Sequence, residues 1–197
     1  MNIKHDQNYQ SQTFSGEDFT GQRLSAVEFS NCTFDGCDFS DAIFSRCIFS
    51  DCTFLKCNLS LVKMDYSKLD EIAFKECKLV GVDWAKVAWP RLILNSPVAF
   101  HDCLLSESSF YGLALSDLVL EGCIARNVDF REGDFNGANF TNTDFSGAMF
   151  AETNLSKVDF CGASEFDIDL FSNKLKQAKF DRFEAVRLLG SLEIELV

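Results

Sequence analysis

The sequence holds little proline, tryptophan, histidine and basic charge. Among 197 residues there are 2 Pro, 2 Trp and 2 His, and 18 Lys and Arg stand against 30 Asp and Glu, a formal charge of −12. This acidic balance argues against direct binding of nucleic acid. The chain also lacks a run of about 18 apolar residues, and its polar start lacks a signal-peptide core, so we expect a soluble, cytoplasmic protein that enters no membrane.

The residues that commonly carry catalysis are equally scarce. The two histidines are His5 and His101, and the sequence has no glycine-rich phosphate loop, no nucleophile elbow and no paired metal motif. His101 beside Asp102 is the nearest approach to a catalytic pair. We therefore expect a protein that is not an enzyme and that needs neither a cofactor nor a metal.

Cysteine is abundant, but in a pattern that does not suit a disulfide scaffold. The count of 9 is odd, and disulfide scaffolds are typically short exported chains. We expect reduced thiols. Two interpretations of them remain open, a metal or redox ladder and a small buried apolar filler, and the second is favoured because free cysteine is commonly buried.

A period of five residues organises most of the chain. From Phe14 to Trp89 every fifth residue is large and apolar, and after a slip of one residue the pattern resumes at Phe100 and runs to Phe160, with Ala125 the one small member. A second class lies two residues before these centres. It holds eight of the nine cysteines and many of the Val and Ala residues: Val27, Cys32, Cys37, Ala42, Cys47, Cys52, Cys57, Val62, Cys77, Val82, Cys103, Cys123, Val128, Ala138, Ala148 and Val158.

A strict five-residue period fits neither a helix nor a continuous strand. Helices repeat every 3.6 residues and strands every two. A short extended piece followed by a corner satisfies the period, with the large residue and the small one before it pointing inward. The other three positions are rich in Ser, Asp, Asn, Gly, Glu and Thr, which suit turns and solvent.

This pattern resembles the pentapeptide-repeat family over roughly residues 12 to 180. Ala138-Asn139-Phe140-Thr141-Asn142 and Thr153-Asn154-Leu155-Ser156-Lys157 are close to the family's repeating unit. The resemblance implies an all-β solenoid, a right-handed quadrilateral β-helix with four units per coil, and a short C-terminal helix and tail. We expect an N-terminal cap at 1–13, a first stack at 14–89, a register break at 90–99, a second stack at 100–180 and a C-terminal helix and dimerisation tail at 181–197.

The register break contains both prolines, Pro90 and Pro97. Proline suits a bulge or a corner change, so a kink between two stacks is one interpretation. The other is a loop that contacts a partner through Pro90, Arg91 and Pro97. The segment resembles the place where Qnr-type proteins carry a larger loop, here reduced to about one extra residue.

The C-terminal tail suggests a cap that also joins two chains. Residues 181–189 read as a short helix with Asp181 as N-cap and Gly190 as its stop, and residues 192–196 alternate like a strand. An open solenoid end needs a cap, but this tail has more apolar surface than one end requires. We expect a two-fold homodimer through Phe183, Val186, Leu188, Leu189, Leu192, Ile194 and Leu196.

The negative charge is concentrated in one segment. Residues 95–169 carry 13 acidic and 3 basic side chains, whereas residues 14–94 carry 12 and 9. At the β spacing the first of these segments holds about one net negative charge per 1.8 Å, against roughly 1.7 Å for duplex DNA. The candidate outward acids are Asp102, Glu107, Asp117, Glu121, Asp129, Glu132, Asp134, Asp144, Glu152 and Asp159.

Further likenesses suggest a function for this charge. The tail is similar to that of the Qnr and MfpA proteins, and Asn58-Leu59-Ser60-Leu61, Gly81-Val82-Asp83-Trp84 and Trp89-Pro90 are similar to the albicidin-resistance member and to McbG. The resemblance implies a DNA mimic that binds DNA gyrase, and topoisomerase IV beside it, and that counters poisons such as albicidin, microcin B17 or quinolones. Solvation alone also accounts for exposed acids, and a generic scaffold with no topoisomerase role is the alternative.

Overall fold

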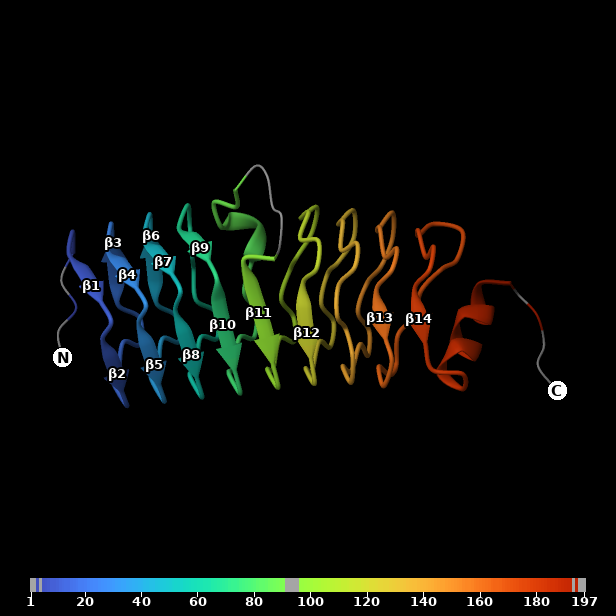
Figure 1. Cartoon of the computed structure of the whole chain (residues 1–197), viewed down its shortest axis with the longest axis horizontal. Coiled ribbons are helices and arrows are strands. Elements are labelled where there is room, and N and C mark those ends of the chain that lie inside the picture. Colours follow the sequence, from blue (N-terminus) through green and yellow to red (C-terminus); the bar gives the residue numbers. More distant parts are fainter. Residues whose placement is uncertain (1–2, 4, 91–95, 193, 195–197) are drawn as a thin grey trace.

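The computed structural model describes residues 3, 5–90, 96–192 and 194. The chain winds into a long stack of coils, with its two termini at opposite ends of the stack (Figure 1). The regular elements are β1 (Asn8–Gln10), β2 (Thr13–Ser15), β3 (Arg23–Ser25), β4 (Glu28–Ser30), β5 (Thr33–Asp35), β6 (Ile43–Ser45), β7 (Ile48–Ser50), β8 (Thr53–Leu55), β9 (Lys68–Asp70), β10 (Ile72–Lys75), η1 (Trp84–Lys86), β11 (Val98–His101), β12 (Val119–Glu121), β13 (Asp159–Phe160), β14 (Lys179–Phe180) and η2 (Glu184–Leu192).

Strand pairing confirms a coil of four five-residue units. Phe14 of β2 pairs with Phe34 of β5, and Phe34 pairs with Phe54 of β8, so parallel partners lie twenty residues apart. The longest sheet runs β12-β11-β10-β8-β5-β2 along one side, and β1-β4-β7-β9 runs along another. Tyr9 of β1 already pairs with Phe29, within the range expected to be a cap. The predicted all-β solenoid class is confirmed.

The large residue of each unit fills the centre of the stack. Every one of these positions from Phe14 to Trp84 and from Phe100 to Phe160 is buried, and Trp89 is partly buried. Most rings one coil apart stack in parallel, as Phe34 and Phe54 do with centroids 4.6 Å apart, whereas Phe140 and Phe160 meet edge-on. A buried phenylalanine contributes roughly 1.5–3 kcal/mol, so stability is distributed along the whole length.

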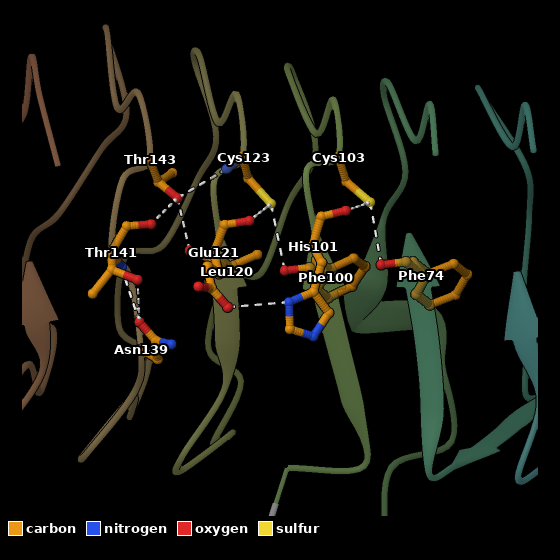
Figure 2. Close-up of polar contacts among 10 residues, drawn as sticks. All are labelled: Phe74, Phe100, His101, Cys103, Leu120, Glu121, Cys123, Asn139, Thr141 and Thr143. Carbon is orange, nitrogen blue, oxygen red and sulfur yellow. Dashed lines mark hydrogen bonds and ion pairs between the residues drawn. The ribbon is translucent and has the colours of Figure 1, made fainter. Parts of the chain in front are cut away.

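The smaller inward positions are also buried, and their polar groups are hydrogen-bonded. Eight cysteines are buried and free, and Cys161 is partly exposed, as its outward position predicts. Figure 2 shows the thiol of Cys103 directed at the carbonyl of Phe74, at 3.4 Å, one coil earlier. Cys123 makes the same contact with Phe100 at 3.6 Å. These thiols therefore do more than fill space, because they also donate hydrogen bonds to backbone carbonyls inside the stack.

Burial and neighbouring thiols raise the pKa of several of these cysteines. Desolvation raises the pKa of Cys52 to about 11. The hydrogen bond with the Cys103 thiol, together with burial, raises the pKa of Cys77 to about 12. Cys52 and Cys77 therefore stay protonated at neutral pH and can donate hydrogen bonds. Thiolates are the reactive and metal-binding form of cysteine.

Ser, Thr and Asn replace cysteine at some positions of this inner row and make the same bonds. Thr143 donates its hydroxyl to the carbonyl of Leu120 at 2.7 Å and accepts from the amide of Cys123 at 3.1 Å (Figure 2). Thr153 bonds in the same way to the carbonyl of Phe130 at 3.1 Å. The side chain that suits this position is therefore small and able to donate.

We predict that Thr143→Val destabilises the chain although it keeps the shape of the side chain. The substitution removes the hydroxyl that joins Leu120 and Cys123, and a buried polar group left without its partner costs about 1–3 kcal/mol. Urea unfolding should show a lower midpoint with an unchanged slope. Thr143→Cys restores a donor and should cost less. Equal losses for both variants would show that this hydrogen bond adds nothing.

The register break is longer than the sequence period suggests. Phe74 of β10 pairs with Phe100 of β11, 26 residues later rather than 20, so the break adds six residues to one coil. The expectation of about one extra residue was wrong, because insertions of one and six produce the same shift of a five-residue period. In Figure 1, η1, just before the break, lies at the side of the stack next to β10 and β11.

The base of this insertion is held by local hydrogen bonds. The side chain of Asp83 accepts from the amide of Ala85 at 3.1 Å at the start of η1, and the indole of Trp89 donates to the carbonyl of Trp84 at 2.9 Å. Pro90 is exposed and Pro97 is buried. Pro97 is therefore not available for the contact that was expected of it, and Arg91 lies outside the described residues.

The C-terminal end departs from the sequence expectation in its details. Phe180 of β14 pairs with Phe160 of β13, so the stack continues past the irregular unit at Glu165. In that unit the buried central residue is Phe166, one residue after the position that the five-residue period predicts. Glu165, which occupies the predicted position, lies at a corner with φ 57°.

The helix at the C-terminus was placed too early. η2 is a 3-10 helix that begins at Glu184 and passes through Gly190, so Gly190 does not stop it. The carboxylate of Asp181 accepts from the amide of Gly162 instead of capping the helix, and only its carbonyl reaches Ala185. Leu192 ends the helix, and residues 193, 195 and 196 of the expected strand lie outside the described residues.

Candidate functional site

The ten candidate acids all have exposed or partly exposed side chains, as predicted. Five of them lie at corners where φ is between 54° and 62°, two residues after a buried centre. These are Asp102, Glu107, Asp117, Glu132 and Glu152. The other five lie next to a centre on the outer face of a unit. These are Glu121, Asp129, Asp134, Asp144 and Asp159.

The acids surround the stack rather than forming a patch on one side. Asp102 follows the centre Phe100, Glu107 follows Leu105, and Asp117 follows Leu115, so they lie at different corners of the coil. Glu132 and Glu152 occupy the remaining corner in the next two coils. Because each unit turns the chain by one side, a five-residue pattern of acids spreads its charge around the rod.

Two of the corner acids are fitted against glycines of the next coil. A Cβ atom added at Gly122 would lie 2.5 Å from a carboxylate oxygen of Asp102, and one at Gly137 would lie 2.5 Å from that of Asp117. Such distances leave no room for a side chain. The two glycines therefore allow these carboxylates to lie along the stack.

Four of the ten acids are paired with cationic or titratable side chains. Asp129 binds Arg131 at 2.8 Å, Asp144 binds Arg126 at 2.7 Å, and Asp159 binds Lys179 at 2.9 Å. Glu121 lies 3.2 Å from the Nδ1 atom of His101 on the preceding coil (Figure 2). Exposed pairs of this kind contribute about 0–1 kcal/mol, but they locally cancel charge.

Hydrogen bonds lower the pKa of the three aspartates that pair with Arg or Lys side chains. The Arg131 guanidinium holds the pKa of Asp129 below its ordinary value. Partial burial acts to raise the pKa of Asp144, but hydrogen bonds from Ser146 and Arg126 outweigh it and lower the pKa. Asp129, Asp144 and Asp159, which pair with basic side chains, are thus all anionic at neutral pH.

The other six acids form what we call the acidic surface. Among the residues that the structure describes (3, 5–90, 96–192 and 194), none of these six acids takes part in an ion pair. Glu132 accepts the hydroxyl of Tyr111, and Asp134 accepts from the side-chain amide of Asn154 at 2.9 Å. The acidic surface consists of Asp102, Glu107, Asp117, Glu132, Asp134 and Glu152.

Sequence alone did not separate paired from unpaired acids. Lys179 lies twenty residues after Asp159, and Glu121 twenty after His101, so each pair joins adjacent coils. The twenty-residue coil could have predicted these two contacts. Arg126 reaches Asp144 across eighteen residues, which depends on the side-chain conformation as well as on the coil.

The C-terminal apolar residues are distributed unevenly. Phe183 is 87% exposed, and Val186, Leu192 and Ile194 are 40–53% exposed. Leu188 packs against the core and Leu189 is half-buried. Leu196 lies outside the described residues. The end of the stack therefore presents apolar side chains that are exposed in the described part of the chain.

Neither a metal centre nor a membrane span is found in the part of the chain that the structure describes. No group of three or more His, Cys, Asp or Glu side chains there is placed to hold a metal ion. No helix among the same residues is long and apolar enough to cross a bilayer. The acidic surface and the apolar C-terminal end thus remain as candidate sites.

Comparison with known proteins gives the family. A trypsin-treated variant of QnrB1, a plasmid-mediated fluoroquinolone resistance protein, superimposes with TM-score 0.57 at 22% identity, over 97% of this chain and 99% of that one. Full-length QnrB1 gives a TM-score of 0.51 at 22% identity, over 95% and 100%. No curated protein matches the sequence. The profile of the pentapeptide repeat region matches residues 27–97 and 96–180. The chain belongs to the pentapeptide-repeat family.

Proposed function

We propose that the chain is a DNA-mimicking protein that binds DNA gyrase, and topoisomerase IV by the same surface, and that protects the enzyme from poisons. This proposal depends on one observation: six acids around a narrow rod form no ion pair with any residue that the structure describes. With about one net negative charge per 1.8 Å along residues 95–169, the rod approaches the charge density of duplex DNA. A basic saddle that accepts DNA would accept such a surface.

The likeness to QnrB1 supports the same proposal. That protein is a fluoroquinolone resistance protein, and its fold spans nearly the whole of both chains. Resistance to a gyrase poison is what a competitor for the DNA-binding saddle would provide. The role needs no catalysis, and it places the protein in the cytoplasm with its target. The albicidin-resistance type remains our proposal for the subgroup.

The apolar end supports a two-fold homodimer as the active form. Phe183, Val186, Leu192 and Ile194 are exposed together at the end of the stack that follows the acidic surface. A contact through these ends would place two acidic surfaces on either side of the dimer centre and double the length of the mimic. Apolar residues gathered in this way commonly mark such an interface.

We predict that Phe183→Asp converts the dimer to a monomer. A carboxylate in an apolar contact would be desolvated without a partner, and sedimentation should show the mass of one chain. Ile124→Asp, on a side of the stack and 40% exposed, is the matched control and should remain dimeric. A monomeric unaltered chain at working concentration would contradict the proposed interface.

The direct test of gyrase binding is its dependence on salt. Screening shortens the reach of exposed charges from about 10 Å at 0.1 M to about 3 Å at 1 M ionic strength. The dissociation constant of the complex with purified gyrase should therefore rise steeply with salt. Binding that does not change with salt, or no binding at all, would contradict the proposal.

A further inference from the structure

Two corners of one coil carry large apolar side chains where the other described corners carry polar residues, glycine or, once, alanine. Leu61 and Tyr66 both have φ 58°, and they are 53% and 76% exposed. The other non-glycine residues described with positive φ are Asp, Glu, Asn, Ser, Arg, Lys, Gln or one Ala. The two residues lie on either side of one face of the coil, because they are consecutive corners.

A leucine and a tyrosine at these two corners are unfavourable for the isolated chain. The left-handed region favours Gly, Asn and Asp, and a leucine or tyrosine placed there gains nothing from the backbone. Their exposure also leaves apolar surface in water. A place where local rules are broken without gain for the fold is a candidate for contact with another molecule.

A hollow of about 290 Å³ lies between the Leu61 corner and η1. Val62 and Met64, both buried, form part of its lining, and Leu61 extends along the stack over Gly81. A Cβ atom at Gly81 would lie 2.7 Å from Cδ2 of Leu61. We call this hollow the groove. Its lining residues are Asp41, Leu61, Val62, Lys63, Met64, Asp65, Gly81, Asp83 and Lys86.

The rim of the groove carries charges that the described part of the chain does not pair. Asp41, Asp65 and Asp83 stand against Lys63 and Lys86, and no ion pair among the described residues includes any of them. The carboxylates outnumber the ammonium groups. An apolar floor inside a mainly acidic rim fits a protein segment that presents an aliphatic or aromatic side chain next to a cationic one.

We propose that the groove is a second contact with the topoisomerase, separate from the acidic surface; this inference rests on the proposed function. The acidic surface attracts any basic saddle over a long range, whereas an apolar contact acts at short range and depends on shape. The occupant is a surface segment of the enzyme with an apolar side chain and a neighbouring Arg or Lys. The groove thus supplies affinity that salt does not screen.

The test compares the chain with the variant Leu61→Asn, which removes the exposed apolar side chain of the groove, in binding to purified gyrase. Asparagine is well tolerated at positive φ, so the fold should be kept. Losing one buried apolar anchor corresponds to about a tenfold loss of affinity. We expect at least that loss at low and at high salt alike, with the salt dependence itself unchanged. Gln177→Asn, a neutral corner residue with φ 63°, is the control and should bind normally.

A second pair of variants changes the groove without touching its exposed side chains. Gly81→Ala should displace Leu61 and weaken binding, whereas Gly112→Ala has a similar φ, +67° against +70°, and meets nothing within 4 Å. If the unaltered chain binds gyrase and neither Leu61→Asn nor Gly81→Ala weakens binding, the groove proposal is overturned alone. If the unaltered chain does not bind gyrase, the proposed function and the groove proposal are both overturned.

Discussion

Reversing four acids of the acidic surface should abolish gyrase binding. The variant with Glu107, Asp117, Glu132 and Glu152 each changed to Lys has nine acidic and seven basic side chains in residues 95–169, in place of 13 and 3. The net charge of residues 95–169 changes from −10 to −2, and the new cations repel a basic saddle. We expect a loss of affinity of at least about 100-fold, or about 2.7 kcal/mol. Surface plasmon resonance at graded salt should also show a flatter salt dependence.

The matched control carries the same change of total charge in the other half of the stack. Asp6, Asp51, Glu71 and Glu76 also lie at corners with φ 52–54°. Reversing them to Lys tests total charge, and the exposed ion pair of Glu76 with Lys56 that is lost contributes only about 0–1 kcal/mol. This control should keep most of the affinity. Equal losses in both variants would place the effect in the net charge, and no loss in either would rule out mimicry of DNA.

Removing a ring from the middle of the stack should have the largest effect on stability. Phe130 stacks between Phe110 and Phe150, with centroids 5.3 and 5.1 Å away, and meets Phe135 edge-on at 5.4 Å. Phe130→Ala leaves a cavity that rigid neighbouring coils cannot close. We expect a loss of about 3–5 kcal/mol in the free energy of unfolding, measured by urea denaturation.

A phenylalanine outside the core provides the comparison. Phe171 is 78% exposed, so Phe171→Ala should change the free energy of unfolding by no more than about 0.5 kcal/mol. Because each coil contacts only its neighbours, Phe130→Ala should also broaden the transition as the stack loses cooperativity. A loss below about 1 kcal/mol for Phe130→Ala would show that the rings are not the main source of stability.

The regular part of the fold could be predicted from the sequence because one physical constraint repeats. Each unit must bury one large residue and turn a corner, so the period of five identifies Phe34, Phe54 and their equivalents as core. The same constraint predicted that Cys103 and Cys123 are buried and that Cys161 is not. Four units per coil came from the family resemblance, and the pairing of Phe14 with Phe34 confirms it.

The irregular parts could not be predicted because the period does not encode them. An insertion of six residues shifts a five-residue register as one residue does, so only the pairing of Phe74 with Phe100 reveals its length. The choice of Phe166 over Glu165 as a centre depends on burying a ring instead of a carboxylate. The start of η2 at Glu184 depends on how the last coil is covered, and Leu188 packs against that coil.

The candidate site was predicted in composition but not in arrangement. The sequence identified the ten acids, and the structure separates Asp129, Asp144 and Asp159, which bind basic side chains, from acids such as Glu107 and Asp117, which do not. Side-chain pairing depends on which residues adjacent coils bring together. The corner residues Leu61 and Tyr66 carried a signal in the sequence, since they break the polar pattern of the corners.

The central claim is tested most directly by purified gyrase challenged with albicidin, microcin B17 and a fluoroquinolone in parallel. Supercoiling is measured for each poison with the unaltered chain and with the variant in which Glu107, Asp117, Glu132 and Glu152 are reversed. We predict that the unaltered chain restores supercoiling against at least one poison and that the variant restores none. A chain that neither restores nor inhibits supercoiling would contradict the account and favour a scaffold without a role at topoisomerases.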